Sequence, residues 1–208
     1  MGQRPREMPD MTPSQRWKNW WYYHWRQLLL GAAVAAILAG ILRTQLTQAR
    51  PDCGVALVTA HPLASEEVAA IQAVLDGICP DVNGDGRGSV ALNVIQIDFA
   101  LDYGAEMDGG TRMVVTSNLD KLSADFYTRQ SGIFLLEDPV GFQAAYEALE
   151  PGTIPWRDCP GAAEAALENC DGGALCFARR IAPTEEDRRA LAGAAALWEE
   201  LERRSEDG

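Results

Sequence analysis

The chain has 208 residues, enough for one domain of ordinary size and a tail, and its net charge is −12. The charge is uneven: the segment before Leu28 is basic, whereas residues 51–208 hold 11 Lys/Arg against 28 Asp/Glu. An acidic domain repels nucleic acid and anionic lipid headgroups, which argues against both as its partners. It favours cations, basic partners, or a role in solubility alone.

An apolar run, Leu28–Leu42, predicts a membrane anchor. Its 15 residues are fewer than the roughly 20 that a spanning helix needs, but both flanks extend it. We expect a span over residues 25–46, a basic tail over 1–24 in the cytoplasm and a domain over 47–208 outside, following the positive-inside rule. The alternative is a cleaved secretory signal. The 27 residues before the run favour an uncleaved anchor.

A dense aromatic cluster precedes the run and is typical of the headgroup level of a bilayer. Its members are Trp17, Trp20, Trp21, Tyr22, Tyr23 and Trp25. This cluster has a function at that level only if the anchor is retained in the mature protein.

From Cys53 onward, strand-like and helix-like patterns alternate. The predicted strands are residues 54–59, 90–99, 133–136 and 174–179. The predicted helices are residues 65–79, most of 111–130, a helix that opens at Asp138-Pro139 and a last one that opens at Thr184. This alternation predicts an α/β fold: one domain with a mostly parallel, roughly four-stranded sheet covered by helices.

Several local details accompany this prediction. Ser65 is expected to cap its helix, and Ser117 has the capping-box spacing to Asp120. The apolar residues of 90–99 change parity after Val94, which suggests a bulge or a strong twist. A short strand over Met113–Val115 is an alternative to helix, and residues 151–173 are expected to be irregular apart from an Ala-rich turn.

All five cysteines lie in the part that is expected to be outside, in an oxidising compartment. Cys159 and Cys170 flank a short loop in the irregular segment, and they are the predicted disulfide. Cys53 and Cys79 form a second pair if the ends of their strand and helix meet. Cys176 is interpreted as a buried apolar residue. The spacings match no common zinc pattern.

The strongest chemical signal is a half calcium loop. Asp81, Asn83 and Asp85 supply oxygens at positions 1, 3 and 5, Gly86 makes the sharp turn at position 6, and Arg87 offers its carbonyl at position 7. These four oxygen donors (Asp81, Asn83, Asp85 and Arg87) are the predicted metal ligands, and calcium is the predicted cofactor.

The second half of the calcium loop is missing. Leu92 stands at position 12, where a bidentate glutamate is expected, so an ion needs waters or a carboxylate such as Asp98 or Asp102. The alternative is a plain turn, because Asn-Gly and Asp-Gly readily adopt positive φ.

Weaker candidates follow two of the predicted strands. His61 comes after the first strand, and Glu137 and Asp138 come after the third, so all three can gather at the carboxyl edge of a parallel sheet. Asp138 is also explained as a helix cap. No catalytic motif is recognisable, and we expect that the protein is not an enzyme.

Four segments together resemble an uncharacterised family of small single-pass membrane-anchored proteins of Gram-positive anaerobes. They are WKNWWYYHWRQ, PDCGVALVT, DVNGDGRGSVALNVIQIDF and SGIFLLEDPVGFQ, about a quarter of the chain. That resemblance implies a location but no activity. The segment LSADFYTRQSGIFLLED also resembles one lobe of extracytoplasmic solute-binding proteins, which need two lobes for a complete receptor.

Three functions follow from these observations. The first is a membrane-anchored extracytoplasmic binding or interaction module, stabilised by calcium, with the lipid bilayer and a membrane protein as partners. The second is a solute-capture lobe that works with a transporter. The third is an enzyme without a recognisable motif.

Overall fold

The structure is a computed structural model that describes residues 12–47, 51–101, 109–165, 167 and 174–207. The chain divides into two compact units, Met1–Ala49 and Arg50–Gly208.

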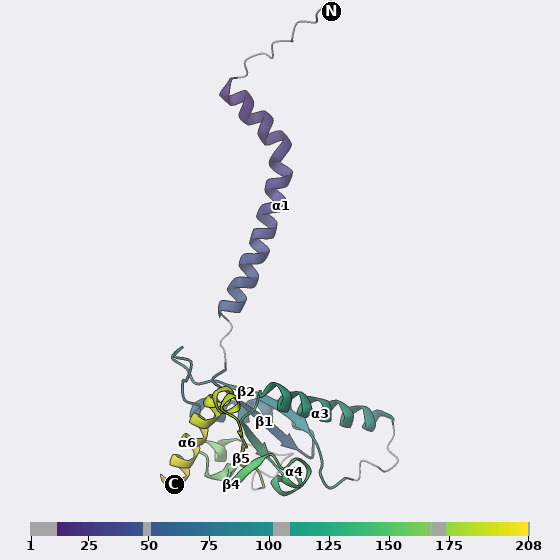
Figure 1. The fold of residues 1–208 in the computed structure, drawn as a ribbon, viewed down its shortest axis with the longest axis vertical. Coiled ribbons are helices and arrows are strands. Elements are labelled where there is room, and N and C mark those ends of the chain that lie inside the picture. Colours follow the sequence, from purple (N-terminus) through teal and green to yellow (C-terminus); the bar gives the residue numbers. More distant parts are fainter. Residues whose placement is uncertain (1–11, 48–50, 102–108, 166, 168–173, 208) are drawn as a thin grey trace, which may run out of the picture. The chain divides into compact units, whose positions relative to one another are not determined.

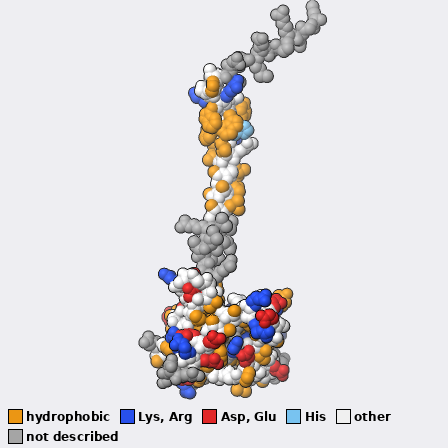
Figure 2. Space-filling model, turned by 60° about the vertical axis from the view of Figure 1, so that its left-hand side comes forward, with side chains coloured by type: hydrophobic (Ala, Val, Ile, Leu, Met, Phe, Trp, Pro, Cys, Tyr) orange, Lys and Arg blue, Asp and Glu red, His pale blue; other side chains and the backbone are white. Residues whose placement is uncertain are grey.

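The first unit is built on one long helix, α1 (Pro13–Thr47). Its aromatic side chains are exposed, and Figure 2 shows apolar side chains along the helix with Lys and Arg near its N-terminal end. Trp20 stacks on Trp17 and lies beside His24, with ring centroids 5.2 Å apart in each pair. Within the described residues, no helix is long and apolar enough to cross a membrane. The predicted anchor, residues 25–46, falls inside α1 and stays a prediction.

The second unit contains one sheet with the strand order β2-β1-β3-β5-β4 (Figure 1). The strands are β1 (Cys53–Thr59), β2 (Val90–Gln96), β3 (Ile133–Leu136), β4 (Leu149–Pro155) and β5 (Cys176–Arg180). β1 pairs in parallel with β2 and β3, whereas β5 runs antiparallel to β3 and β4. The α/β prediction is confirmed. The mostly parallel, four-stranded sheet is corrected to a mixed, five-stranded one.

The unpredicted strand is β4, which lies in the segment expected to be irregular. Its sequence contains Pro151, Gly152 and Pro155, which are residues of turns. Proline has no N–H to donate to a ladder, but it is tolerated on an edge strand, and β4 is at the edge of the sheet.

Helices cover both faces of the sheet. They are α2 (Ser65–Ile78), α3 (Gly109–Thr128), α4 (Pro139–Tyr146), α5 (Glu185–Ala190) and α6 (Ala192–Asp207), with short 3₁₀ turns at Trp156–Asp158 and Ala162–Glu164. The core on one face contains the buried residues of α2 and α6, and the core on the other face contains those of α3 and α4. In Figure 1, α6 and α3 lie on opposite sides of the strands.

Alternation along the strands explains this division. In β1, Val55 and Leu57 belong to the core under α2 and α6, whereas Ala56 and Val58 belong to the core under α3 and α4. In β2, both parities are apolar for the same reason. Its register with β1 runs without interruption from Val90 to Gln96, so the predicted bulge is wrong.

The helix ends agree only partly with the predictions. Asp138 caps α4 by accepting from the Gly141 amide, and Thr184 caps α5 by accepting from the Asp187 amide, as expected. Ser65 is the first residue of α2, not its cap. Ser117 lies in the middle of α3, which also takes up the alternative strand over Met113–Val115.

Candidate functional site

The parallel strands β1, β2 and β3 start at one edge of the sheet, the amino edge, and end at the opposite edge, the carboxyl edge. The predicted metal ligands lie at the amino edge, in the acidic loop (residues 81–87) that precedes β2. The residues predicted to follow strands lie at the carboxyl edge. The two edges use their carboxylates differently.

Within the acidic loop, side-chain oxygens accept hydrogen bonds from backbone amides. Asp81 accepts from the amides of Gly84, Asp85 and Gly86 at 2.7, 3.1 and 2.8 Å. Asn83 accepts from the Asp85 amide at 2.8 Å. Gly84 and Gly86 have φ of +79° and +89°, which a residue with a Cβ rarely adopts. The loop is therefore a tight turn organised around the Asp81 carboxylate.

The two remaining predicted ligands take a smaller part in this turn. Asp85 accepts from the Arg87 amide at 3.0 Å. Both residues are exposed. The described residues contain no group of three or more His, Cys, Asp or Glu that could hold a metal ion. Calcium has suitable hard-oxygen donors here, but the carboxylates would have to turn from the amides to the ion, so calcium stays a prediction.

A carboxylate from outside the loop holds it against the sheet. Asp52 accepts from the amides of Val82 and Asn83 at 2.8 Å each, and from the Ser89 amide at 2.9 Å. Burial raises the pKa of Asp52, but these amide hydrogen bonds, with that from the Ser89 hydroxyl, outweigh burial and hold the pKa below its usual value. Asp52 is the residue that fixes the loop in place.

Sequence reasoning missed Asp52, although a signal was present. β1 and β2 pair in parallel with Cys53 opposite Val90, so the residues just before them, Asp52 and Ser89, must also lie side by side. The carboxylate that was expected to reach the loop, Asp98, follows β2 and lies beyond the other end of that strand. Asp102 lies outside the described residues.

At the carboxyl edge, neighbouring strands lead to opposite faces of the sheet. β1 continues into α2 on one face, and the adjacent β3 continues into α4 on the other. In open α/β sheets, ligands bind outside the strand ends at such a switch point. The sequence pattern predicts that His61, Glu137 and Asp138 gather at this edge, and the parallel pairing of β1 and β3 brings their positions to it.

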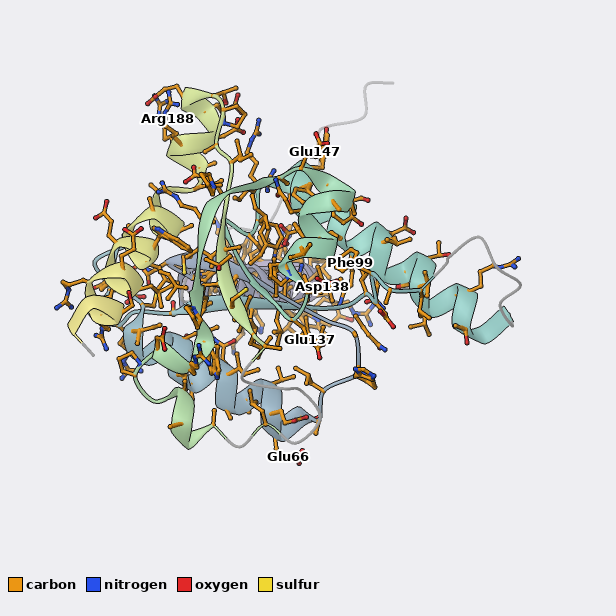
Figure 3. All side chains as sticks on the ribbon, turned by 90° about the horizontal axis from the view of Figure 1, so that it is seen from below. Glu66, Phe99, Glu137, Asp138, Glu147 and Arg188 are labelled. Carbon is orange, nitrogen blue, oxygen red and sulfur yellow. The ribbon has the colours of Figure 1, made fainter. Side chains whose placement is uncertain are left out.

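Glu137 spans the switch point. Its Oε2 accepts from the Ala60 amide at 2.7 Å, and its own amide donates to the Val58 carbonyl at 3.1 Å. Figure 3 shows Glu137, Asp138 and Phe99 close together near the centre of the view, while Glu66 of α2 lies apart. His61 and Asp138 are exposed. This edge therefore presents carboxylates and one imidazole to solvent.

Two further groups at the carboxyl edge are used by the fold. The buried Thr59 hydroxyl donates to the His61 carbonyl at 2.8 Å. Cys176 begins β5 opposite Leu136, and burial raises the pKa of its thiol. A buried thiol with a raised pKa carries little thiolate at neutral pH and is a poor nucleophile. Cys176 is therefore unsuited to act as a nucleophile at this edge.

The cysteines expected to pair fall in different places. Cys159 is buried, and burial raises its pKa to about 11. Its predicted partner, Cys170, lies outside the described residues, so this disulfide stays a prediction. Cys53 and Cys79 do meet, with their sulfur atoms 3.6 Å apart. Cys176 is buried, as expected.

Comparison with known proteins adds no relative. No family model matches the chain, and neither a curated protein nor a solved structure is significantly similar to it.

Proposed function

We propose that the chain is a membrane-anchored binding module whose extracytoplasmic domain holds a positively charged partner at the carboxyl edge. One observation carries this proposal: the loops that follow the adjacent strands β1 and β3 leave to opposite faces, and carboxylates follow the strand ends there. A domain with 28 Asp/Glu against 11 Lys/Arg attracts cationic groups over a long range.

The anchor is the second part of the proposal. The apolar run Leu28–Leu42 lies within α1, a continuous helix of 35 residues that is about 52 Å long. The large side chains described on it are exposed, including Leu29, Leu30 and Ile37 at 58, 68 and 63 %. The run within this helix is apolar on all sides and is stabilised by an apolar environment, which a bilayer with the aromatic cluster at its headgroup level supplies.

The proposed topology has a direct test. Reporter fusions at Arg6 and at Gly208 are expected to report opposite compartments, with the N-terminus in the cytoplasm. A mature protein that begins after Ala49 would contradict the retained anchor.

The proposed binding edge is tested with a hexalysine peptide as probe, on the full-length protein in detergent micelles. Glu137→Gln keeps an oxygen for the Ala60 amide and removes one charge. It is expected to weaken peptide binding about five-fold, which corresponds to about 1 kcal/mol. Glu147→Gln is the matched control, because Glu147 is exposed and its loss changes the net charge equally.

An affinity loss below two-fold is expected for Glu147→Gln. Equal losses in the two variants would reduce the binding to general attraction by an acidic surface, and would overturn the assignment of the carboxyl edge.

A solute-capture lobe is the second candidate. The segment that resembles one lobe of solute-binding proteins, residues 122–138, ends at Glu137 and Asp138, which are the residues of the switch point. Solute-binding proteins close two lobes around a ligand, so a lobe of this kind would complete its site with a second domain. Binding of a small amine by the isolated protein would favour this candidate over a protein partner.

A further inference from the structure

Two buried cysteines meet at the amino edge, beside the acidic loop. Cys53 is the first residue of β1, and Cys79 follows the last residue of α2. Their side chains are 6 % and 8 % exposed, and their sulfur atoms are 3.6 Å apart. A disulfide needs a separation of about 2.05 Å, so the two sulfur atoms have to move closer by about 1.5 Å.

We propose that Cys53 and Cys79 form a disulfide that braces the acidic loop and the Asp52 clamp, which is the set of hydrogen bonds by which the Asp52 carboxylate holds this loop. The proposal rests on the proposed extracytoplasmic location only for the source of oxidant in the cell, since the geometry is a property of the folded domain. The other described cysteines lack such a partner: the thiol of Cys159 donates to the Pro160 carbonyl, and that of Cys176 to the Leu136 carbonyl.

The local electrostatics give the two thiols different roles. The Cys53 thiol donates to Cys79, and this hydrogen bond lowers the pKa of Cys79 despite burial and the nearby Asp52 carboxylate. The same hydrogen bond, followed by burial, raises the pKa of Cys53. The first proton of the pair therefore leaves most easily from Cys79, whose thiolate is the nucleophile.

The reaction is an exchange with a small-molecule disulfide, which is the oxidant. The Cys79 thiolate attacks one sulfur of that disulfide, forms a mixed disulfide and releases a thiolate that takes up a proton. Cys53 then loses its proton and attacks the Cys79 sulfur, which forms the protein disulfide and releases a second thiol. The protein loses two electrons and two protons, and the oxidant gains them. Because both thiols are buried in the folded domain, a local opening of the amino edge must first let the oxidant reach Cys79.

The bond would fix both ends of the acidic loop. Cys53 directly follows Asp52, and Cys79 lies two residues before Asp81. The thiol of Cys79 also donates to the Ser89 carbonyl at 3.6 Å, and a Cβ on Gly88 would lie 1.7 Å from the Cys79 carbonyl oxygen. The segment after the loop thus runs directly against Cys79, so a covalent link here restrains the loop, its clamp and the start of β2 together.

Peptide mapping tests the bond itself. The full-length chain is unfolded, reduced, refolded in micelles with oxidised and reduced glutathione, and its free thiols are alkylated in acid. Cleavage after Glu66 and Glu67 separates Cys53 from Cys79, whereas trypsin has no site between them. Mass spectrometry without reductant is expected to find the two peptides cross-linked. Alkylated Cys53 and Cys79, or either of them linked elsewhere, would overturn the proposal.

Thermal unfolding tests the bracing. The comparison is made in a Cys170→Ser background, which removes the other predicted disulfide. Reductant is expected to lower the melting temperature by about 10 °C, since the bond joins residues 26 apart. Adding Cys79→Ser should abolish this difference, and adding Cys176→Ser should preserve it. Hydrogen exchange at the amides of Val82, Asn83 and Ser89 should accelerate on reduction. Unchanged melting and exchange would refute the bracing even where the cross-link is found.

Discussion

The two edges of the sheet use similar side chains for different purposes. At the amino edge, Asp52 and Asp81 each accept hydrogen bonds from three backbone amides, so their oxygens complete the fold. At the carboxyl edge, Glu137 accepts one amide and Asp138 caps one helix, beside the exposed His61. Carboxylates that accept several backbone amides therefore stabilise the fold, whereas the carboxylates at the switch point have fewer such partners and are the better candidates for recognition.

The largest effect is expected where the amino edge is most tightly packed. Gly88→Ala places a Cβ 1.7 Å from the Cys79 carbonyl oxygen, which is part of the backbone and cannot move away easily. We expect the free energy of unfolding to fall by about 3 kcal/mol, measured by chemical denaturation. Gly86→Ala is the control: its Cβ meets nothing within 4 Å, and only its φ of +89° is strained. A cost of about 1 kcal/mol is expected there. Equal costs would mean that the contact with Cys79 does not matter.

The next effect concerns the Asp52 clamp. Asp52→Ala leaves the amides of Val82, Asn83 and Ser89 without their acceptor, and partial exposure to water limits the loss. We expect the free energy of unfolding to fall by about 2 kcal/mol. Asp85→Ala, which removes an acceptor for one exposed amide, should cost less than about 0.5 kcal/mol. Similar losses in the free energy of unfolding for both variants would show that Asp52 contributes no more to stability than Asp85.

Calcium is expected to act on the amino edge with a smaller effect. A site of about 10⁻³ M affinity in 5 mM calcium stabilises the folded state by about 1 kcal/mol, a rise in melting temperature of about 2–4 °C. Asp85→Ala should abolish this gain, whereas Glu147→Gln should retain it. An unchanged transition of the unsubstituted protein in calcium would leave the acidic loop as a plain turn.

Acid is expected to weaken the amino edge through the half-buried ion pair between Asp187 and Arg129, which precedes β3. Hydrogen bonds from Thr184 and then from Arg129 hold the pKa of Asp187 at about 2, below its usual 3.8. Because this pKa is lowered in the folded state, its contribution to stability is present above about pH 4 and is lost as pH falls toward 2. Asp187→Asn should flatten the dependence of unfolding on pH in that window. An unchanged slope would show that Arg129 and Thr184 do not stabilise the charged form.

The sequence predicted the buried strands and the apolar stripes of the helices well. β1 and β3 are short apolar runs that only a covered sheet accommodates, and Leu119, Leu122 and Phe126 lie on the face of α3 that packs on the sheet. β4 could not be predicted from its composition, because Pro151 and Gly152 are tolerated only through its position at the edge. An edge position is a property of the whole sheet.

The candidate sites divide in the same way. The positions of His61, Glu137 and Asp138 at one edge follow from strand order alone, which explains why sequence reasoning could place them. The hydrogen bonds between Asp52 and the acidic loop depend on the pairing of β1 with β2. A motif read along the sequence does not contain this pairing. The contact between Cys53 and Cys79 depends instead on the packing of α2 along β1, which returns the end of the helix to the start of the strand.

Hydrogen exchange of the full-length protein, with and without the hexalysine peptide, compares the two edges in one measurement. Recognition at the carboxyl edge predicts slower exchange of amides in residues 60–64 and 137–141 when the peptide is bound, and unchanged exchange in residues 82–89. Slower exchange confined to residues 82–89 would place recognition at the amino edge and contradict the proposed division between the two edges.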